Sequence, residues 1–261
     1  MDGVNKTLYI PLYGKALVSR KGILLEDQWA ERIWEKEGFA LKGKTASKWL
    51  AYTMGMRAKV FDRWAEEKMQ ADPDAVVLHI GCGLDSRSER VKRNGQLWYD
   101  IDFPDVIAVR RKYYREEDNV RLIAADMRQA SWKEAVSGQR AIVIMEGASM
   151  YFRPEELSAL LQGLGERFHK VSLLMDCYTV FAAKASKYKN PINDVGVTQV
   201  YGLEDPAALA RETGFSCVAE HDLTPTEMID QLEKGERRIF RFLYAGSAAR
   251  KLYRLYEFQK G

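Results

Sequence analysis

Cysteine and histidine are scarce in this sequence of 261 residues, which contains three of each. The cysteines, Cys82, Cys177 and Cys217, stand far apart and form no C-x-x-C pair, so the sequence predicts neither a disulfide framework nor a redox motif. The scattered histidines likewise argue against a structural or catalytic zinc site. We therefore expect no metal site, and a chemistry that does not depend on a histidine-rich constellation.

Long apolar runs and an excess of one charge are also missing. No apolar stretch reaches the roughly 18–20 residues that cross a bilayer, and the first residues lack the features of a secretory signal peptide. Lys plus Arg number 40 against 37 for Asp plus Glu, and this net charge of +3 does not favour a dedicated nucleic-acid or membrane-surface binder. With 46% apolar residues, the composition predicts a soluble, cytoplasmic globular protein with a sizeable core.

The pattern of apolar residues changes near Asp72-Pro73. Before this point, the stretches ILLEDQWAERIWEKEGF and RAKVFDRWAEEKM space their apolar and tryptophan residues along one helical face. We expect residues 1–72 to form a helical cover that is integrated with a core of residues 73–261. The aromatic residues of the cover are interpreted chiefly as core packing.

Seven short apolar runs follow, separated by amphipathic or turn-rich stretches. The runs are residues 75–80, 96–102, 120–126, 141–146, 171–176, 215–222 and 252–258. Unalternated apolar strands between helices are typical of a parallel sheet that is covered on both faces. The last two runs are interpreted as an antiparallel pair at one edge. The predicted fold class is therefore α/β, doubly wound, with a mostly parallel seven-stranded sheet.

Glycine or an acid stands at the end of four successive predicted strands. The turn Gly81-Cys82-Gly83 follows the first strand, Asp102 ends the second, and Asp126 and Glu146 end the third and fourth. Ligands bind at the carboxyl ends of the strands in open α/β sheets. Four such ends in register therefore indicate one ligand site.

The first two strand ends have a spacing that suits a nucleotide. A Gly-rich turn lets the backbone approach a ligand, and an acid about 20 residues further on can accept both ribose hydroxyls. Asp102, at the tip of its strand, is better placed for this than Asp100, which can equally be a solvated or a structurally paired acid. Ser86 stands where G-x-G-x-x-G has its third glycine, which weakens the alternative of an NAD-dependent oxidoreductase.

Four longer motifs occur in order along the chain. They are LHIGCGLDSR, WYDIDFPDVIAVRRK, AADMRQASW and MEGASMYFRPEEL. This series resembles that of the leucine carboxyl methyltransferase family, which includes bacterial polyketide-type O-methyltransferases, over about residues 15–220. The resemblance implies a Rossmann-like class I methyltransferase fold, S-adenosylmethionine (SAM) as the cofactor, and a helical N-terminal cover over the active site.

The resemblance also implies roles for individual residues. Lys15 and Arg57 resemble two basic residues that hold the methionine carboxylate, which an arginine can clasp through two hydrogen bonds. Glu146 corresponds to an acid near the methionine moiety and Tyr151 to a residue on the acceptor side, and these two are the predicted catalytic residues. The nucleoside contacts implied are Gly81, Cys82 and Gly83 in the turn beneath the cofactor, Asp102 at the ribose, and Asp126 and Met127 at the adenine.

The acceptor oxygen decides whether the enzyme needs a general base. A carboxylate is ionised at neutral pH, whereas a phenol, with a pKa of about 10, would gain from a base. His79, His169 and His221 are each interpreted as structural, which slightly favours a carboxylate acceptor. Hydroxyl methylation, methylation of a protein C-terminus and a non-catalytic SAM-binding module stay open as alternatives.

A carboxylate acceptor is expected to meet a cation in the pocket. The candidates are Arg20, Lys21, Arg153, Lys184 and Lys187. The segment 176–202, with its aromatic and basic residues, suits a substrate-facing lid or, equally, a surface helix and its loop. The predicted partner is a small-molecule acceptor, with no nucleic acid and no membrane, and the sequence leaves the oligomeric state open.

Overall fold

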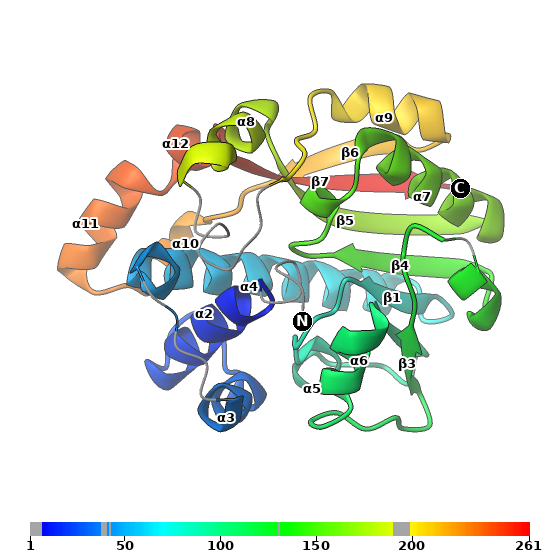
Figure 1. The fold of residues 1–261 in the computed structure, drawn as a ribbon, viewed down its shortest axis with the longest axis horizontal. Helices are drawn as coiled ribbons and strands as arrows, with labels where there is room; N and C mark the ends of the chain where they lie inside the picture. The colour runs from blue at the N-terminus through cyan, green and yellow to red at the C-terminus, as the bar shows by residue number, and fades with distance from the viewer. Residues whose placement is uncertain (1–6, 38–40, 42, 130, 190–198) are drawn as a thin grey trace.

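The computed structural model of the protein describes residues 7–37, 41, 43–129, 131–189 and 199–261. At its centre lies a seven-stranded sheet in the order β3-β2-β1-β4-β5-β7-β6 (Figure 1). Strands β1 to β5 pair in parallel, whereas β7 runs antiparallel to both of its neighbours, β5 and β6. The prediction of a doubly wound, mostly parallel seven-stranded sheet is confirmed.

Each predicted apolar run forms a strand. The strands are β1 (Val76–Ile80), β2 (Trp98–Asp102), β3 (Val120–Ala124), β4 (Arg140–Met145), β5 (Lys170–Tyr178), β6 (Ser216–His221) and β7 (Tyr253–Lys260). The two late strands pair with each other as expected, but only β6 lies at the edge. β7 lies inside the sheet because Leu255 and Phe258, both fully buried, fill its two faces.

The segment before β1 is helical, as predicted. It contains α2 (Tyr9–Arg20), α3 (Gln28–Glu37), the 3-10 turn η1 (Gly43–Ala46) and the 24-residue helix α4 (Lys48–Ala71). Phe61, Trp64 and Met69 of α4 are buried in the same cluster as Val77 of β1. Helix α4 therefore covers one face of the sheet as well as carrying the N-terminal helices (Figure 1).

The other face of the sheet is covered by α7 (Pro154–Arg167) and α9 (Pro206–Thr213). Leu161 and Leu164 of α7 are fully buried in one cluster with Leu78 of β1, because alternate residues of each strand face opposite layers. The remaining short helices are α5 (Arg87–Arg90), α6 (Pro104–Arg110), η2 (Ser131–Ala135), η3 (Ser149–Tyr151), α8 (Val180–Lys189), α10 (Thr226–Ile229), α11 (Lys234–Leu243) and α12 (Gly246–Arg250). Within the described ranges, every helix is too short or too polar to cross a membrane.

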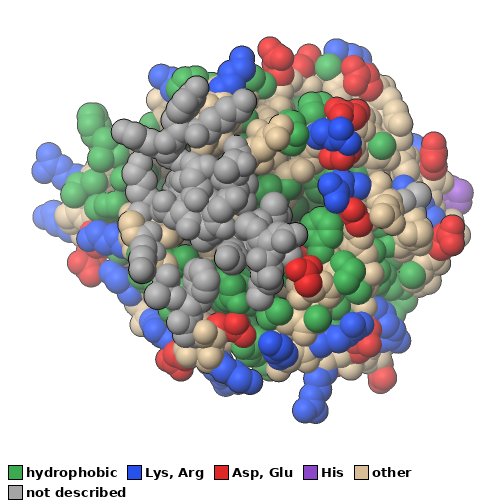
Figure 2. Space-filling model, viewed as in Figure 1, with side chains coloured by type: hydrophobic (Ala, Val, Ile, Leu, Met, Phe, Trp, Pro, Cys, Tyr) green, Lys and Arg blue, Asp and Glu red, His purple; other side chains and the backbone are tan. Residues whose placement is uncertain are grey.

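Helices α10, α11 and α12 fill the connection between β6 and β7. Ile239, Phe242 and Leu243 of α11 are exposed, and Figure 2 shows hydrophobic side chains gathered at the left edge, where Figure 1 draws α11. Phe240 of the same helix is fully buried, so one apolar side chain of α11 packs in the core while its apolar neighbours reach the surface.

Candidate active site

One large cavity, of about 1170 Å³, opens at the carboxyl ends of β1, β2, β3 and β4. Pockets for one small ligand have volumes of roughly 300–1,000 Å³, so this cavity has room for two bound molecules. All ten predicted site residues line it, namely Lys15, Arg57, Gly81, Cys82, Gly83, Asp102, Asp126, Met127, Glu146 and Tyr151. The structure thus brings together residues that lie as many as 136 positions apart in the chain, from Lys15 to Tyr151.

The turn after β1 needs its glycines. Gly81 and Gly83 have φ angles of +72° and +53°, in the left-handed region that other residues rarely adopt. A Cβ at Gly81 would also lie 2.7 Å from the Cβ of Ala148, so the turn and the segment after β4 are in close contact. Cys82 between them is buried, and burial raises the pKa of its thiol, which therefore stays protonated and is no nucleophile.

We expect Gly81→Ala to destabilise the protein more than Gly95→Ala does. Both glycines have a positive φ, but nothing lies within 4 Å of a Cβ added at Gly95. The control therefore suffers only backbone strain of roughly 1–2 kcal/mol, whereas the Gly81 variant adds an overlap of about 1–3 kcal/mol. Urea denaturation of both variants measures the difference, and equal losses would show that Ala148 moves away freely.

Asp100 and Asp102 have different environments although both belong to β2. Asp102 lines the cavity, where its two carboxylate oxygens accept hydrogen bonds from the backbone N–H groups of Gly83 and Phe103, each at 2.7 Å. Burial raises the pKa of Asp102 to about 6 against the opposing effect of these bonds. Asp100 is fully buried beneath the cavity and accepts a hydrogen bond from Arg110 at 2.6 Å. Its interpretation as a structurally paired acid is confirmed.

The end of β3 forms another part of the cavity wall. Met127 is buried there, while the Asp126 carboxylate binds the guanidinium of Arg128 at 2.6 Å. The Asp126 side chain is 23% exposed, so it is accessible from the cavity although it is ion-paired. This local pair was not predicted from the sequence.

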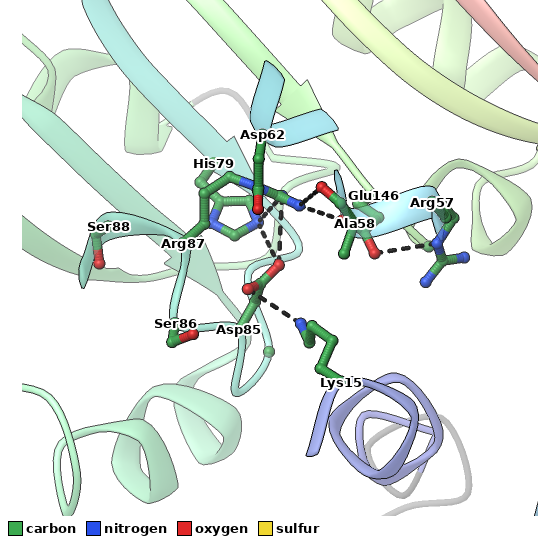
Figure 3. Close-up of polar contacts among 12 residues, drawn as sticks. Lys15, Arg57, Ala58, Asp62, His79, Asp85, Ser86, Arg87, Ser88 and Glu146 are labelled. Carbon is green, nitrogen blue, oxygen red and sulfur yellow. Dashed lines mark hydrogen bonds and ion pairs between the residues drawn. The ribbon is translucent and has the colours of Figure 1, made fainter. Parts of the chain in front are cut away.

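Glu146 lies between two arginines. Its Oε1 atom accepts a hydrogen bond from Arg57 Nε at 3.0 Å, and its Oε2 atom binds Arg87 (Figure 3). Burial alone would raise the pKa of Glu146, but Arg87 and Arg57 outweigh it and bring the pKa to about 2. Glu146 is therefore ionised at neutral pH with both oxygens engaged, which suits positioning of Arg57 rather than proton transfer.

A cluster of ion pairs connects this glutamate to the N-terminal helices. Arg87 donates to Asp62 of α4 at 2.7 Å and lies 3.3 Å from Asp85, and Lys15 of α2 binds Asp85 at 3.0 Å (Figure 3). Burial would raise the pKa of Asp85, but its basic neighbours hold it well below its usual range. Asp62, Asp85 and Arg87 were missed in the sequence. For Asp85 and Arg87 the available signal was their proximity to the glycine turn, whereas Asp62 lies on α4, distant from the turn in the chain.

Tyr253 is a further residue that sequence reasoning missed. Its hydroxyl lines the cavity, donates a hydrogen bond to Asp176 at 2.7 Å and accepts one from Arg57 Nη1 at 2.9 Å. Arg57 also binds the Asp176 carboxylate directly at 2.9 Å. Arg57 and Tyr253 are 196 positions apart, so no local motif could have linked them.

Four of the five predicted acceptor cations do not line the cavity. Arg20, Lys21, Arg153 and Lys184 are absent from its lining, and the first three are engaged elsewhere, with Glu35, Tyr52 and Glu156. The side chain of Lys187 lies outside the described residues. In the described part of the chain, the lysines and arginines of the lining are Lys15, Arg57 and Arg128, and each is ion-paired.

The three histidines have different environments, and of the three His79 is among the residues that line the cavity. His79 is buried and contacts Asp100 at 3.1 Å, and burial lowers its pKa. His221 pairs with Glu257 at 2.8 Å, and neither His221 nor His169 lines the cavity. Helix α8, from the predicted lid segment, contributes Ala182, Ala185 and Ser186 to the lining, while residues 190–198 of that segment lie outside the described residues.

Comparison with known proteins identifies the family. The profile of the leucine carboxyl methyltransferases matches residues 6–165. The tetracenomycin polyketide synthesis O-methyltransferase TcmP of Streptomyces glaucescens is 31% identical over 213 residues, which are 80% of this chain and 78% of that protein. The chain belongs to the leucine carboxyl methyltransferase family. As a member of this family it is a SAM-dependent methyltransferase, which rules out the NAD-dependent alternative.

One further relative is similar to this chain in sequence, and two solved structures are similar to it in fold. The S-adenosyl-L-methionine-dependent methyltransferase dpfgK of Gibberella zeae is 25% identical over 235 residues, with 80% of this chain and 78% of that protein covered. A methyltransferase-like protein of Thermobifida fusca has the same fold, with a TM-score of 0.58 at 14% identity over 95% of this chain and 94% of that one. Magnesium protoporphyrin IX methyltransferase of Synechocystis, with S-adenosylhomocysteine (SAH) bound, gives a TM-score of 0.51 at 14% identity over 88% and 93%.

The residues at the strand ends fit the family's cofactor. The glycine turn leaves no space for a side chain at residue 81, so backbone forms this part of the wall. Asp102 presents a nearly buried carboxylate whose raised pKa reflects burial, and hydroxyl donors from a ribose would stabilise its ionised form. The cavity therefore offers both the shape and the polar groups that a nucleoside requires.

Proposed function

We propose that the protein transfers the methyl group of SAM to a carboxylate oxygen of a small, largely apolar molecule and so forms a methyl ester. The observation that carries this proposal is the protonation state of the groups around Arg57. Glu146 is ionised and bound by two arginines, while burial raises the pKa of Tyr151 so that its phenol stays protonated. These groups donate hydrogen bonds or stabilise charge, and they are poor proton acceptors at neutral pH.

A carboxylate acceptor suits such a site because it is already ionised. An oxygen acceptor is also supported by the name of TcmP, which is an O-methyltransferase. When bound, SAM supplies an electrophilic methyl group on a cationic sulfonium. The positive charge of the sulfonium can attract an anionic acceptor, so the site does not need a lysine or arginine for this purpose. In this proposal Lys15 and Arg57 hold the methionine carboxylate, and Asp102 holds the ribose.

The walls of the cavity supply the remaining requirements of methyl transfer. Asp126 and Met127 are assigned to the adenine, and Gly81, Cys82 and Gly83 to the surface beneath the cofactor. Displacement at a methyl group demands alignment of the two reactants and exclusion of water, so orientation provides much of the rate. Tyr151 contributes a hydroxyl donor on the acceptor side.

The pH dependence of turnover tests the acceptor class. With 2-naphthoate as the probe, we expect kcat/KM for methyl ester formation to stay flat between about pH 6 and 9, because the carboxylate is ionised throughout. With a hydroxyl acceptor such as 2-naphthol and no general base, kcat/KM would instead rise nearly tenfold per pH unit below the pKa of that hydroxyl. Methylation of 2-naphthol alone would contradict the proposal.

A hydroxyl acceptor is the second candidate, and the Tyr253–Asp176 pair is the observation that favours it. A proton from an acceptor hydroxyl bound to Tyr253 would have a path to Asp176, whose pKa is raised by burial. Tyr253→Phe separates the two candidates. Naphthol methylation that depends on this pair would fall by about 100-fold or more, whereas naphthoate methylation would keep its flat pH profile.

A further inference from the structure

The cavity has two chemically different halves. In the described part of the chain, its charged lining residues all belong to the half at the ends of β1 to β4, together with Lys15 and Arg57, which reach into it. The other half is formed by the start of α4, by α8 and by the segment from the end of α11 to β7. The described side chains of this second half are uncharged and include Trp49, Leu50, Met54, Ala182, Ala185, Ser186, Leu243, Tyr244, Ala248, Ala249 and Leu252.

The wall formed by α11 and α12 is fixed to the N-terminal helices. The rings of Trp49 and Tyr244 stack with their centroids 5.6 Å apart and an interplanar angle of 13°. Glu236 of α11 accepts hydrogen bonds from Lys48 at 2.8 Å and from Tyr52 at 2.7 Å. These contacts hold α11 and the segment after it against the start of α4.

We propose that the uncharged half holds the body of the acceptor, and that the acceptor is a bulky apolar monocarboxylic acid. This inference rests on the proposed function, in which the acceptor is a carboxylate that lies beside the sulfonium of SAM. An apolar body gains from contact with Trp49, Leu50 and Met54. Each backbone N–H or C=O group of a peptide that faced these side chains would lose its water partner, which costs free energy. The wall therefore favours a small apolar acid over a protein C-terminus.

Ala248 and Ala249 set the size of this acceptor. They come from α12, while Ala182 and Ala185 come from α8, so small side chains line the half from two helices. A phenylalanine at residue 248 would occupy space that the acceptor body needs. Such a change lies in the uncharged half, so it leaves the cofactor residues untouched.

The experiment compares Ala248→Phe with Ser247→Phe, an exposed neighbour on α12 that does not line the cavity. We expect Ala248→Phe to lower kcat/KM for pyrene-1-carboxylate by about tenfold or more while benzoate changes by less than about threefold, a discrimination that steric fit can supply. Ser247→Phe should change neither value. Calorimetric titration with SAH should give the wild-type affinity for both variants, and Ala185→Phe on α8 should reproduce the loss.

The outcomes separate failure of this inference from failure of the proposed function. If the wild type methylates both acids and Ala248→Phe behaves like Ser247→Phe, or lowers both acids equally, the acceptor wall is wrongly assigned. If the wild type methylates 1-pyrenol but neither acid, the carboxylate function fails, and the same two variants on 1-pyrenol still decide the wall. Absence of turnover with all three aromatics overturns the apolar acceptor itself.

Discussion

Replacement of Arg87 by alanine is expected to lower the free energy of unfolding by about 3–5 kcal/mol at neutral pH, the usual cost of leaving a buried charge without its partner. Arg87 is fully buried, donates to Asp62 at 2.7 Å and also binds Glu146. Its removal leaves these carboxylates and Asp85 close together in a dry environment. Urea denaturation at pH 7 measures the loss.

The same variant has a predictable pH dependence. In the folded protein the pKa of Glu146 is about 2, below its ordinary value of 4.5. Its ion pairs therefore stabilise the fold fully above pH 4.5, and this stabilisation is lost as the pH falls towards 2. Without Arg87 this lowering of the pKa diminishes, and protonation relieves the repulsion among the carboxylates. The difference in stability between wild type and Arg87→Ala should therefore shrink when the pH is lowered from 7 to about 4.

Arg63→Ala is the matched control for this prediction. Arg63 lies on the same helix as Asp62 and pairs with Glu227 at 2.9 Å, but its side chain is 44% exposed. Exposed ion pairs contribute about 0–1 kcal/mol, so we expect a small loss without the pH dependence. A loss at Arg87 no larger than that at Arg63 would show that solvent enters the cluster.

The strands were the most predictable part of the fold. The run Val76–Ile80 is buried along its whole length, so its composition alone indicates an interior strand. The position of β7 between β5 and β6 could not be predicted, because pairing between Tyr253–Lys260 and residues 170–178 depends on contacts distant in the chain. Local pattern therefore predicts which residues form strands, while the register is decided by tertiary packing.

The site was predictable where a motif is local. Gly81 and Asp102 each follow directly from a strand end, and the structure brings both to the cavity. Arg57 was found only through resemblance to the family, because an arginine on a helix ordinarily indicates a solvated side chain. Its partners Asp176 and Tyr253 lie 119 and 196 positions away, which no spacing argument could reach.

The acceptor half was the least predictable part. Arg20 and Arg153 satisfied the expectation of a cation by charge alone, but both pair with glutamates outside the cavity. Leu243 and Ala248 were not considered, although the structure places both in the lining. A short amphipathic helix does not reveal which cavity its apolar face will line, because that depends on how the chain returns to β7.

Asp102→Asn is expected to weaken SAH binding by about 100-fold or more. Hydrogen bonds to a charged group contribute about 1.5–3 kcal/mol each, and the assignment gives this carboxylate both ribose hydroxyls. An asparagine keeps the shape of the side chain but loses the charge and one accepting oxygen. Calorimetric titration at pH 8 measures the loss, with Asp105→Asn as the control because Asp105 lines the same cavity three residues further on.

Without cofactor, the ionised carboxylate of Asp102 should make the protein less stable as the pH rises. Burial raises the folded pKa of Asp102 from 3.8 to about 6, so the stability of the protonated form is fully present below 3.8 and is lost as the pH rises through 6. At about 1.4 kcal/mol per pKa unit, the stability of Asp102→Asn relative to wild type should increase by about 3 kcal/mol between pH 4 and 8. If this increase is observed while SAH binds the variant with wild-type affinity, Asp102 is a buried wall residue and the ribose lies elsewhere. If both expectations hold, the protein retains a destabilising charge because the cofactor needs it.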